Sequence, residues 1–216
     1  MINFDGIKGA IFDVDGTMLD SMWMLEIIEA DYLKGFGFTP SLKEVELMNV
    51  LSLRELAEYF RSEYGIAKTV QEIIDERNAL TEEFYFEKAA LKRGVIELLE
   101  KLRERDVKMC VATATDKYLV EASLKRLDIL KYFGKIFTCG DEKTSKSSPD
   151  IFIRAAGFLG TKISETIVFE DAVHAIKSAK SAGFPVVAVY DKSADLNNEE
   201  IRQLADYYLD SMEEII

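Results

Sequence analysis

The latter part of the chain alternates short apolar runs with segments of helical periodicity, and this pattern limits the possible folds. The apolar runs lie at 107–112, 136–138, 166–169 and 185–189. Between them, apolar residues recur three and four positions apart, as in segment 172–182. Short apolar runs predict buried strands, and the three-to-four spacing predicts amphipathic helices. The chain is therefore expected to have an α/β fold, with helices covering both faces of a parallel sheet.

A long helical interval interrupts this alternation after the first apolar run, at 9–12. Three Ser/Thr residues are each followed three positions later by Glu, the spacing of a helix capping box: Ser41 with Glu44, Ser52 with Glu55, and Thr69 with Glu72. Gly35 and Gly65 stand where helices should end. We expect residues 18–90 to form an α-helical cap domain. It would be inserted into a Rossmann-like, doubly wound core made of residues 1–17 and 91–216. The end of the chain is expected to add an edge strand at 207–209 and a final helix.

Composition restricts the partners. The 216 residues carry 39 acidic against 27 basic side chains, a net charge of −12, which disfavours nucleic acid and anionic membranes as partners. No apolar run approaches the ~18 residues of a membrane span, and residues 1–5 lack a basic stretch followed by an apolar one. We therefore expect a cytoplasmic protein, and a monomer. The two cysteines, Cys110 and Cys139, lie in apolar runs and are expected to be buried, reduced thiols.

Two carboxylates follow the first strand directly. Asp13 and Asp15 are two residues apart in Ile11-Phe12-Asp13-Val14-Asp15-Gly16-Thr17, so their side chains leave the same side of an extended backbone. In doubly wound sheets, ligands bind at the carboxyl ends of the strands, where these acids would lie. A polar strand exit with an Asx turn is the simpler explanation for one such Asp, but not for two.

Other strand ends supply groups suited to a phosphate and a cation. Thr113 follows the second strand, with the free N–H of Ala114 at a helix start. Lys146, in Ser145-Lys146-Ser147-Ser148-Pro149-Asp150, precedes another helix. Glu170 and Asp171 end the strand at 166–169 and are the kind of oxygen ligand that Mg²⁺ takes. Each of these features alone is common on protein surfaces.

Taken in order, these motifs resemble those of the haloacid dehalogenase superfamily. Asp-x-Asp-Gly-Thr, then Thr113, then Lys146, then Glu170-Asp171 follow the four motifs of that superfamily. The insertion between the first and second motifs resembles the subfamily with a helical first cap, which includes β-phosphoglucomutase-like and phosphoglycolate-phosphatase-like enzymes. The resemblance covers nearly the whole chain outside the cap.

The resemblance implies a role for each position. Asp13 would attack phosphorus and form an aspartyl phosphate, and Asp15 would act as general acid and then general base. Thr113 and the N–H of Ala114 would bind phosphoryl oxygens, with Lys146 as a counter-charge. Mg²⁺ would be held by Asp13, the backbone carbonyl of Asp15 and Asp171, with Glu170 in direct or indirect contact. A second Asp in the first motif favours a phosphate ester as substrate over a haloacid.

The chain is accordingly expected to be a Mg²⁺-dependent phosphatase of a small phosphorylated metabolite, with a sugar phosphate as one candidate. The alternatives are a phosphomutase of the β-phosphoglucomutase type and a non-enzymatic interaction protein. The His that mutases use falls at Leu25 here, which favours hydrolysis. Arg54 is a candidate substrate-binding residue, with a solvent-exposed helix position as its alternative.

The only His, His174, is expected to have a surface or packing role. Trp23 and Met24 are expected to pack the cap, with pocket lining as the alternative. Asp20 and Ser21 are expected to form the hinge and the N-cap of the first cap helix.

Overall fold

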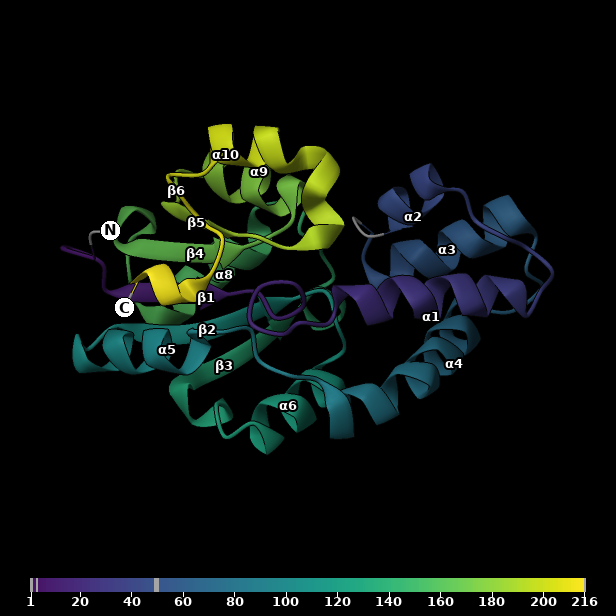
Figure 1. Ribbon diagram of the computed structural model, residues 1–216, viewed down its shortest axis with the longest axis horizontal. Coiled ribbons are helices and arrows are strands. Elements are labelled where there is room, and N and C mark those ends of the chain that lie inside the picture. The colour runs from purple at the N-terminus through teal and green to yellow at the C-terminus, as the bar shows by residue number, and fades with distance from the viewer. Residues whose placement is uncertain (1, 3, 49–50, 216) are drawn as a thin grey trace.

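A computed structural model describes residues 2, 4–48 and 51–215, and the described chain forms one six-stranded parallel sheet with helices around it (Figure 1). Residues 1 and 3, which belong to the N-terminal segment 1–5 discussed above, lie outside the described residues. The strands are β1 (Gly9–Phe12), β2 (Lys108–Thr113), β3 (Phe133–Thr138), β4 (Thr166–Glu170), β5 (Val186–Val189) and β6 (Tyr207–Leu209). Their order in the sheet is β3-β2-β1-β4-β5-β6, and every neighbouring pair is parallel. The expected α/β doubly wound fold is confirmed.

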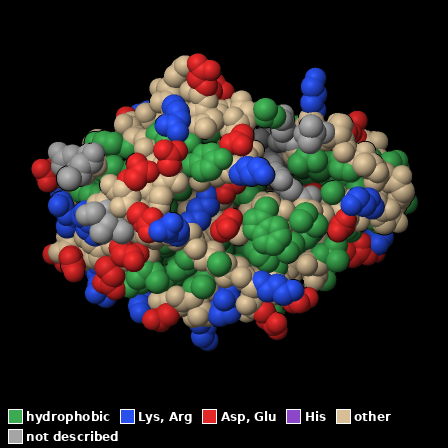
Figure 2. Space-filling view, viewed as in Figure 1, with side chains coloured by type: hydrophobic (Ala, Val, Ile, Leu, Met, Phe, Trp, Pro, Cys, Tyr) green, Lys and Arg blue, Asp and Glu red, His purple; other side chains and the backbone are tan. Residues whose placement is uncertain are grey.

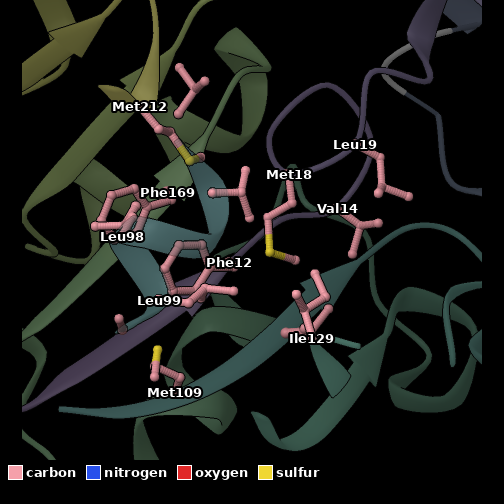
Figure 3. Packing of buried hydrophobic residues seen from close by; sticks show 14 of the residues in the cluster. Phe12, Val14, Met18, Leu19, Leu98, Leu99, Met109, Ile129, Phe169 and Met212 are labelled. Atoms are coloured by element: carbon pink, nitrogen blue, oxygen red, sulfur yellow. The ribbon is translucent and has the colours of Figure 1, made fainter. Parts of the chain in front are cut away.

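Helices cover both faces of the sheet because side chains along each strand alternate between the faces. Phe12 of β1 packs in one core cluster with Leu98 of α5 (Val95–Glu104) and residues of α6 (Lys117–Arg126) (Figure 3). Ile11, the neighbour of Phe12, packs on the opposite face with residues of α8 (Asp150–Leu159), α9 (Val173–Ser181) and α10 (Asn198–Leu204). Central strands buried on both faces explain why the apolar runs in the sequence are continuous.

Short helices complete the order of elements in the sheet region: η2 (Leu130–Tyr132), α7 (Cys139–Glu142), η3 (Ile163–Glu165), η4 (Lys192–Asn197) and η5 (Met212–Ile215). The expected edge strand is β6, which pairs with β5. The expected final helix is the short 3₁₀ helix η5, whose Met212 and Ile215 are buried in the core. Its side chains pack beside α5, so the end of the chain closes one face of the sheet.

The interval between β1 and β2 is helical, as expected. It contains α1 (Met22–Lys34), α2 (Leu42–Met48), α3 (Leu53–Tyr64), α4 (Val70–Glu83) and the π-helix η1 (Phe84–Lys88). All three capping boxes form, with reciprocal bonds between each Ser or Thr and the Glu three residues later. Gly35 and Gly65 follow the last residues of α1 and α3, which confirms them as helix ends.

A separate hydrophobic cluster holds these inserted helices together. Tyr32 and Leu33 of α1 pack with Met48, with Phe60 of α3 and with Ile73 of α4. The helices α1, α2 and α3 extend away from the sheet (Figure 1). The base of the insertion is different, since Leu25 of α1 and Phe84 and Tyr85 of η1 belong to the main core. The insertion thus has its own core at its far end and shares the main core where it joins the sheet. The division at residues 18 and 90 stays a prediction.

No helix among the described residues is long and apolar enough to cross a membrane. Both cysteines are free and buried, as expected, and burial raises their pKa to about 12 for Cys110 and about 11 for Cys139. On the face that Figure 2 shows, acidic and basic side chains are interspersed.

Candidate active site

The predicted motifs meet around one cavity of about 100 Å³ between the sheet and the inserted helices. From the sheet side, the cavity is lined by Asp13, Asp15, Thr113, Ala114, Thr115, Cys139, Lys146, Glu170, Asp171, Ala172 and His174. Most of these residues follow the carboxyl ends of β1, β2 and β4, which are neighbours in the sheet. Parallel pairing therefore brings together residues that are more than 150 positions apart in the sequence.

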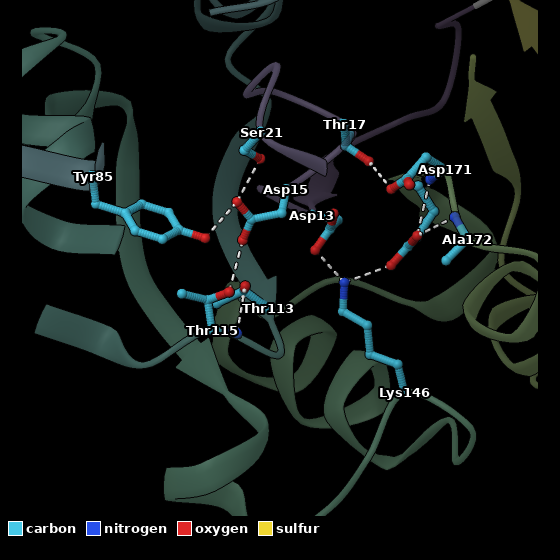
Figure 4. A network of polar contacts seen from close by, with 11 residues as sticks. Asp13, Asp15, Thr17, Ser21, Tyr85, Thr113, Thr115, Lys146, Asp171 and Ala172 are labelled. Carbon is cyan, nitrogen blue, oxygen red and sulfur yellow. Dashed lines mark hydrogen bonds and ion pairs between the residues drawn. The ribbon is translucent and has the colours of Figure 1, made fainter. Parts of the chain in front are cut away.

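Lys146 joins two of the acids. Its Nζ forms an ion pair with Asp13 Oδ1 and donates to Glu170 Oε1 at 2.5 Å, and all three side chains are buried (Figure 4). Burial tends to lower the pKa of Lys146, but the charges of Asp13 and Glu170 raise it, so the ammonium stays protonated. Burial raises the pKa of Asp13 from 3.8 to about 6, even though Lys146 lowers it. The lysine thus favours the anionic form of Asp13 in a site where burial opposes it.

Asp15 is held by three hydroxyl groups. Ser21 Oγ and Tyr85 OH donate to its Oδ1 at 2.6 and 2.7 Å, and Thr115 Oγ1 donates to Oδ2 at 2.7 Å (Figure 4). Burial and the charge of Asp13 raise the pKa of Asp15, and these three hydrogen bonds lower it. A hydroxyl can donate to a carboxylate or accept from a carboxylic acid. The same partners can therefore hold Asp15 in both of the states that a general acid and base passes through.

A phosphate-sized group would meet Thr113 and Ala114 next to Asp13. Thr113 ends β2, and its buried Oγ1 accepts from the N–H of Thr115 at 3.1 Å, which shapes the turn before α6. Both Thr113 and Ala114 line the cavity. The position at a strand end before a helix suits an anion, because backbone N–H groups there have no partner within the helix.

Three acids are close enough to share a cation. Asp13, Glu170 and Asp171 each offer a carboxylate oxygen, and these oxygens lie within 4.8 Å of one another. At that separation two unit charges repel by about 3.5 kcal/mol at an effective dielectric constant of 20. Accordingly, burial and the charges of Glu170 and Asp13 raise the pKa of Asp171 well above its usual value. Three buried acids beside a single buried lysine form an oxygen donor set that fits a divalent cation such as Mg²⁺.

Glu170 and Asp171 differ in what they contact. Glu170 Oε2 accepts the backbone N–H groups of Asp171 and Ala172, both at 2.9 Å, while its other oxygen contacts Lys146. Thr17 Oγ1 donates to Asp171 Oδ1 at 2.9 Å, which leaves Oδ2 for other contacts. Asp15 does not belong to the acidic cluster through its side chain, and the metal contact expected of its backbone carbonyl stays a prediction.

Gly16 allows the first motif to approach the fourth. Its φ of +82° lies in the left-handed region. A Cβ at this position would lie 2.4 Å from Asp171 Oδ2. The Gly in Asp-x-Asp-Gly-Thr is therefore required both by the turn and by the close packing of the acids.

The structure does not bring Arg54 to the cavity. Its side chain is 75% exposed and pairs with Glu58 one turn along α3, at 3.1 Å. The alternative, a solvent-exposed helix residue, describes its position, because Ser52 and Leu53 turn toward the cavity and the next residue faces outward. A substrate contact for Arg54 is not supported by this arrangement.

Other residues of the inserted helices were also considered for the cavity. Leu25 lines the cavity with an apolar side chain, and its correspondence to the His of mutases stays a prediction. Neither Trp23 nor Met24 is among the lining residues, and Met24 packs against the main core while Trp23 is half exposed beside Phe84. His174 is partly buried and lines the cavity, and its surface or packing role stays a prediction.

The contacts of three residues with Asp15 were not predicted. Ser21 occupies the N-cap position of α1, as expected, but its side chain makes no capping bond and contacts Asp15 instead. Thr115 follows Thr113 at the two-residue spacing of an extended backbone, and this spacing could have indicated a shared side. Tyr85 is 70 positions from Asp15 and lies in a π-helix, and local sequence patterns give no sign of either feature.

Comparison with known proteins is consistent with this geometry. The model of the family described as haloacid dehalogenase-like hydrolase matches residues 10–189. The chain is 30% identical over 191 residues to a protein of Drosophila melanogaster named "Probable pseudouridine-5'-phosphatase", covering 86% of this chain and 82% of that protein. It is also 30% identical over 207 residues to "(DL)-glycerol-3-phosphatase 2" of Arabidopsis thaliana, covering 90% and 84%.

The fold also matches solved structures. The crystal structure of CbbY from Rhodobacter sphaeroides in complex with phosphate superposes with a TM-score of 0.84, covering 97% of this chain and 96% of that one. The two sequences are 21% identical, so this likeness concerns the fold.

Proposed function

Because this chain belongs to the haloacid dehalogenase-like hydrolase family, we propose that it is a phosphatase that hydrolyses a small phosphorylated metabolite through an aspartyl phosphate on Asp13. The observation that carries the proposal is the contact of Lys146 with Asp13 beside Asp15, in a cavity that Thr113 also lines. A nucleophile, an acid and a counter-charge within one small cavity are the groups that transfer of a phosphoryl group requires.

In the first half of the reaction, a carboxylate oxygen of Asp13 attacks phosphorus. The bond between phosphorus and the ester oxygen breaks, and protonated Asp15 gives its proton to the departing alcohol. Lys146 lowers the repulsion between the Asp13 carboxylate and the incoming anion, because its ammonium contacts Asp13 directly. Thr113 and the N–H of Ala114 bind the phosphoryl oxygens.

In the second half, Asp15 acts as a base. It takes a proton from a water molecule that attacks the phosphorus of the aspartyl phosphate, which releases inorganic phosphate and restores Asp13. The hydroxyls of Ser21, Thr115 and Tyr85 keep the Asp15 carboxyl group in one place through both halves. Positioning of this kind lowers the entropic cost of the proton transfer.

A divalent cation completes the charge balance, and we propose Mg²⁺. Asp13 and Asp171 would hold it together with the backbone carbonyl of Asp15, and Glu170 would support it from beside Lys146. Bound there, the cation supplies positive charge against the phosphoryl oxygens and the clustered acids. Thr17 and the backbone N–H groups that contact Glu170 keep the donor set in place.

Hydrolysis is favoured over the mutase reaction by Leu25. Its apolar side chain lines the cavity, and the resemblance to the helical-cap subfamily assigns the His of the mutases to this position. The small cavity, closed on one side by the inserted helices, favours a metabolite over a phosphoprotein or a nucleic acid as substrate. A cytoplasmic location and a monomeric state are further parts of this proposal.

The test is phosphate release from a panel of sugar, polyol and small-acid phosphates with Mg²⁺, for the wild type and for Asp13→Asn. We expect release from at least one ester by the wild type, and none by the variant or with a chelator. Hexose-phosphate interconversion is followed in the same samples. Interconversion without phosphate release would refute the phosphatase and identify a mutase, and neither activity on any ester would count against an enzyme.

A further inference from the structure

A buried ion pair lines the cavity on the side of the inserted helices. Glu29 of α1 and Arg77 of α4 come from two helices that pack side by side (Figure 1), and their side chains are 6% and 7% exposed. Arg77 Nε donates to Glu29 Oε1. Apart from Ser52, the other lining residues of this wall are apolar: Met22, Leu25, Met48, Leu51, Leu53 and Leu56. The pair is therefore an exception in a mostly apolar surface.

Each residue of the pair has a polar atom that makes no hydrogen bond. Among the described residues, Glu29 Oε2 and Arg77 Nη1 are buried and have no hydrogen-bond partner. A buried polar group without a partner costs about 1–3 kcal/mol, and more when it is charged. A buried ion pair adds little stability compared with apolar residues of the same volume. Stability therefore does not explain why two charged residues stand in this wall, and a ligand that supplies the missing partners would.

The two free groups indicate the chemistry of that ligand. Glu29 Oε2 can only accept a hydrogen bond when ionised, and Arg77 Nη1 can only donate one. Hydroxyl groups do both, so a substrate that carries more than one hydroxyl could satisfy both atoms. A second anionic group would fit poorly, because Glu29 neutralises Arg77 and would itself repel an anion. Arg77 and Asp15 line the same cavity, so an alcohol that leaves toward Asp15 lies in the cavity that Arg77 also faces.

We propose that Glu29 and Arg77 form a recognition pair for hydroxyl groups of the departing alcohol, so that the substrates are phosphate monoesters of small polyols or sugars. One substrate hydroxyl donates to Glu29 Oε2, and another accepts from Arg77 Nη1. The inference rests on the phosphatase function proposed above and adds the substrate class to it. Both residues bind and orient the substrate and take no part in the transfer of the phosphoryl group.

The test compares esters that differ only in their hydroxyls. Glycerol 1-phosphate is paired with propyl phosphate, a tetritol phosphate with butyl phosphate, and a hexose 6-phosphate with hexyl phosphate. p-Nitrophenyl phosphate serves as a general phosphatase substrate. We expect the wild type to prefer at least one hydroxylated ester over its alkyl partner by about 10- to 100-fold in kcat/KM, the range for losing a hydrogen bond to a charged group.

Two variants assign this preference to the pair. Glu29→Leu combined with Arg77→Met leaves no unpaired charge, and should remove the preference, so that each hydroxylated ester and its alkyl partner have equal kcat/KM within about threefold. Glu29→Gln is nearly isosteric but loses the free acceptor, and should reduce the ratio of kcat/KM between the hydroxylated ester and its alkyl partner by about tenfold. The matched control, Arg93→Met with Glu213→Leu, removes an exposed ion pair outside the cavity lining and should keep the full preference.

The outcomes separate this inference from the function beneath it. Turnover of p-nitrophenyl phosphate with equal kcat/KM for hydroxylated and alkyl esters would overturn the recognition pair and leave the phosphatase intact. The same holds if Glu29→Gln retains the full preference. A wild type that hydrolyses none of these esters would instead overturn the phosphatase proposal, and the recognition pair with it.

Discussion

Replacement of Lys146 by Met tests whether the charge of this lysine stabilises the protein against the repulsion among its buried acids. Lys146 is 6% exposed, and its ammonium contacts both Asp13 and Glu170. The variant keeps most of the side-chain volume and removes the only buried cation described next to the cluster of Asp13, Glu170 and Asp171. Packing is thereby nearly preserved, and the change in stability reports mainly on charge.

The size of the effect follows from the two contacts. At an effective dielectric constant of 20, each charge pair at contact distance contributes about 4 kcal/mol. Removal of the buried ammonium returns a desolvation cost of several kcal/mol, so the net loss should be about 3–5 kcal/mol at pH 8 without metal. For a protein of this size, a loss of that magnitude lowers the unfolding temperature by about 10 °C.

The loss should depend on pH with a definite sign. Asp13 has a folded-state pKa of about 6, above its usual 3.8, so its contribution to stability is full below about pH 3.8 and is lost as pH rises through about 6. Without Lys146, which lowers this pKa, the folded-state value should rise further. The variant should therefore be close to wild type at pH 5 and clearly less stable at pH 8.

The measurement is urea unfolding of both proteins with a chelator at pH 5 and pH 8. Lys177→Met is the matched control, since Lys177 is half exposed and pairs with Glu200 on the surface. We expect the control to change the free energy of unfolding by less than about 1 kcal/mol at either pH. Equal losses for Lys146→Met and Lys177→Met, or a Lys146→Met loss independent of pH, would refute the reasoning.

Three further predictions concern the same site. Tyr85→Phe removes one of three donors to Asp15, so the pKa of Asp15 should rise. The alkaline limb of the pH profile of kcat/KM should then move up by about one pH unit. Tyr118→Phe loses only a surface bond to Glu82 and should leave this limb unchanged. Mg²⁺ at about 100 times its dissociation constant should raise the unfolding temperature at pH 8 by about 5–10 °C, and Asp171→Asn should abolish most of this rise; an equal rise in that variant would contradict the metal site. Gly16→Ala should destabilise by at least about 2 kcal/mol more than Gly37→Ala in urea unfolding, because both have positive φ but only Gly16 faces a carboxylate at 2.4 Å; similar losses would mean that backbone strain alone requires Gly16.

Local patterns in the sequence were sufficient for the sheet region. A parallel strand buried on both faces must be apolar throughout, so β1, β2, β4 and β5 appear as continuous apolar runs in the sequence. The capping boxes beginning at Ser52 and Thr69 could also be recognised in the sequence, because their bonds join residues three positions apart. Features that depend on neighbours along the chain could thus be predicted from the chain.

The same reasoning placed the main acids and Lys146 at one edge. In a parallel sheet the carboxyl ends of adjacent strands meet, so Asp13 and Asp171, which follow β1 and β4, had to be close once both strands were identified. The residue types, together with their positions at the strand ends, were sufficient to identify these residues as candidates. Their exact contacts, such as that of Lys146 with both Asp13 and Glu170, required the coordinates.

Only the tertiary structure decided which residues of the inserted helices contact one another and the residues at the edge of the sheet. Tyr85 reaches Asp15 across 70 residues, and Glu29 meets Arg77 across 48, and no periodicity encodes either distance. The sequence made Arg54 a candidate substrate ligand and Ser21 a helix cap. The packing of α3 and α1 instead leaves Arg54 paired with Glu58 in solvent and directs Ser21 to Asp15. Spacing along a helix specifies which residues share a face, but the partner of that face depends on how separate elements pack, and that is a property of the whole fold.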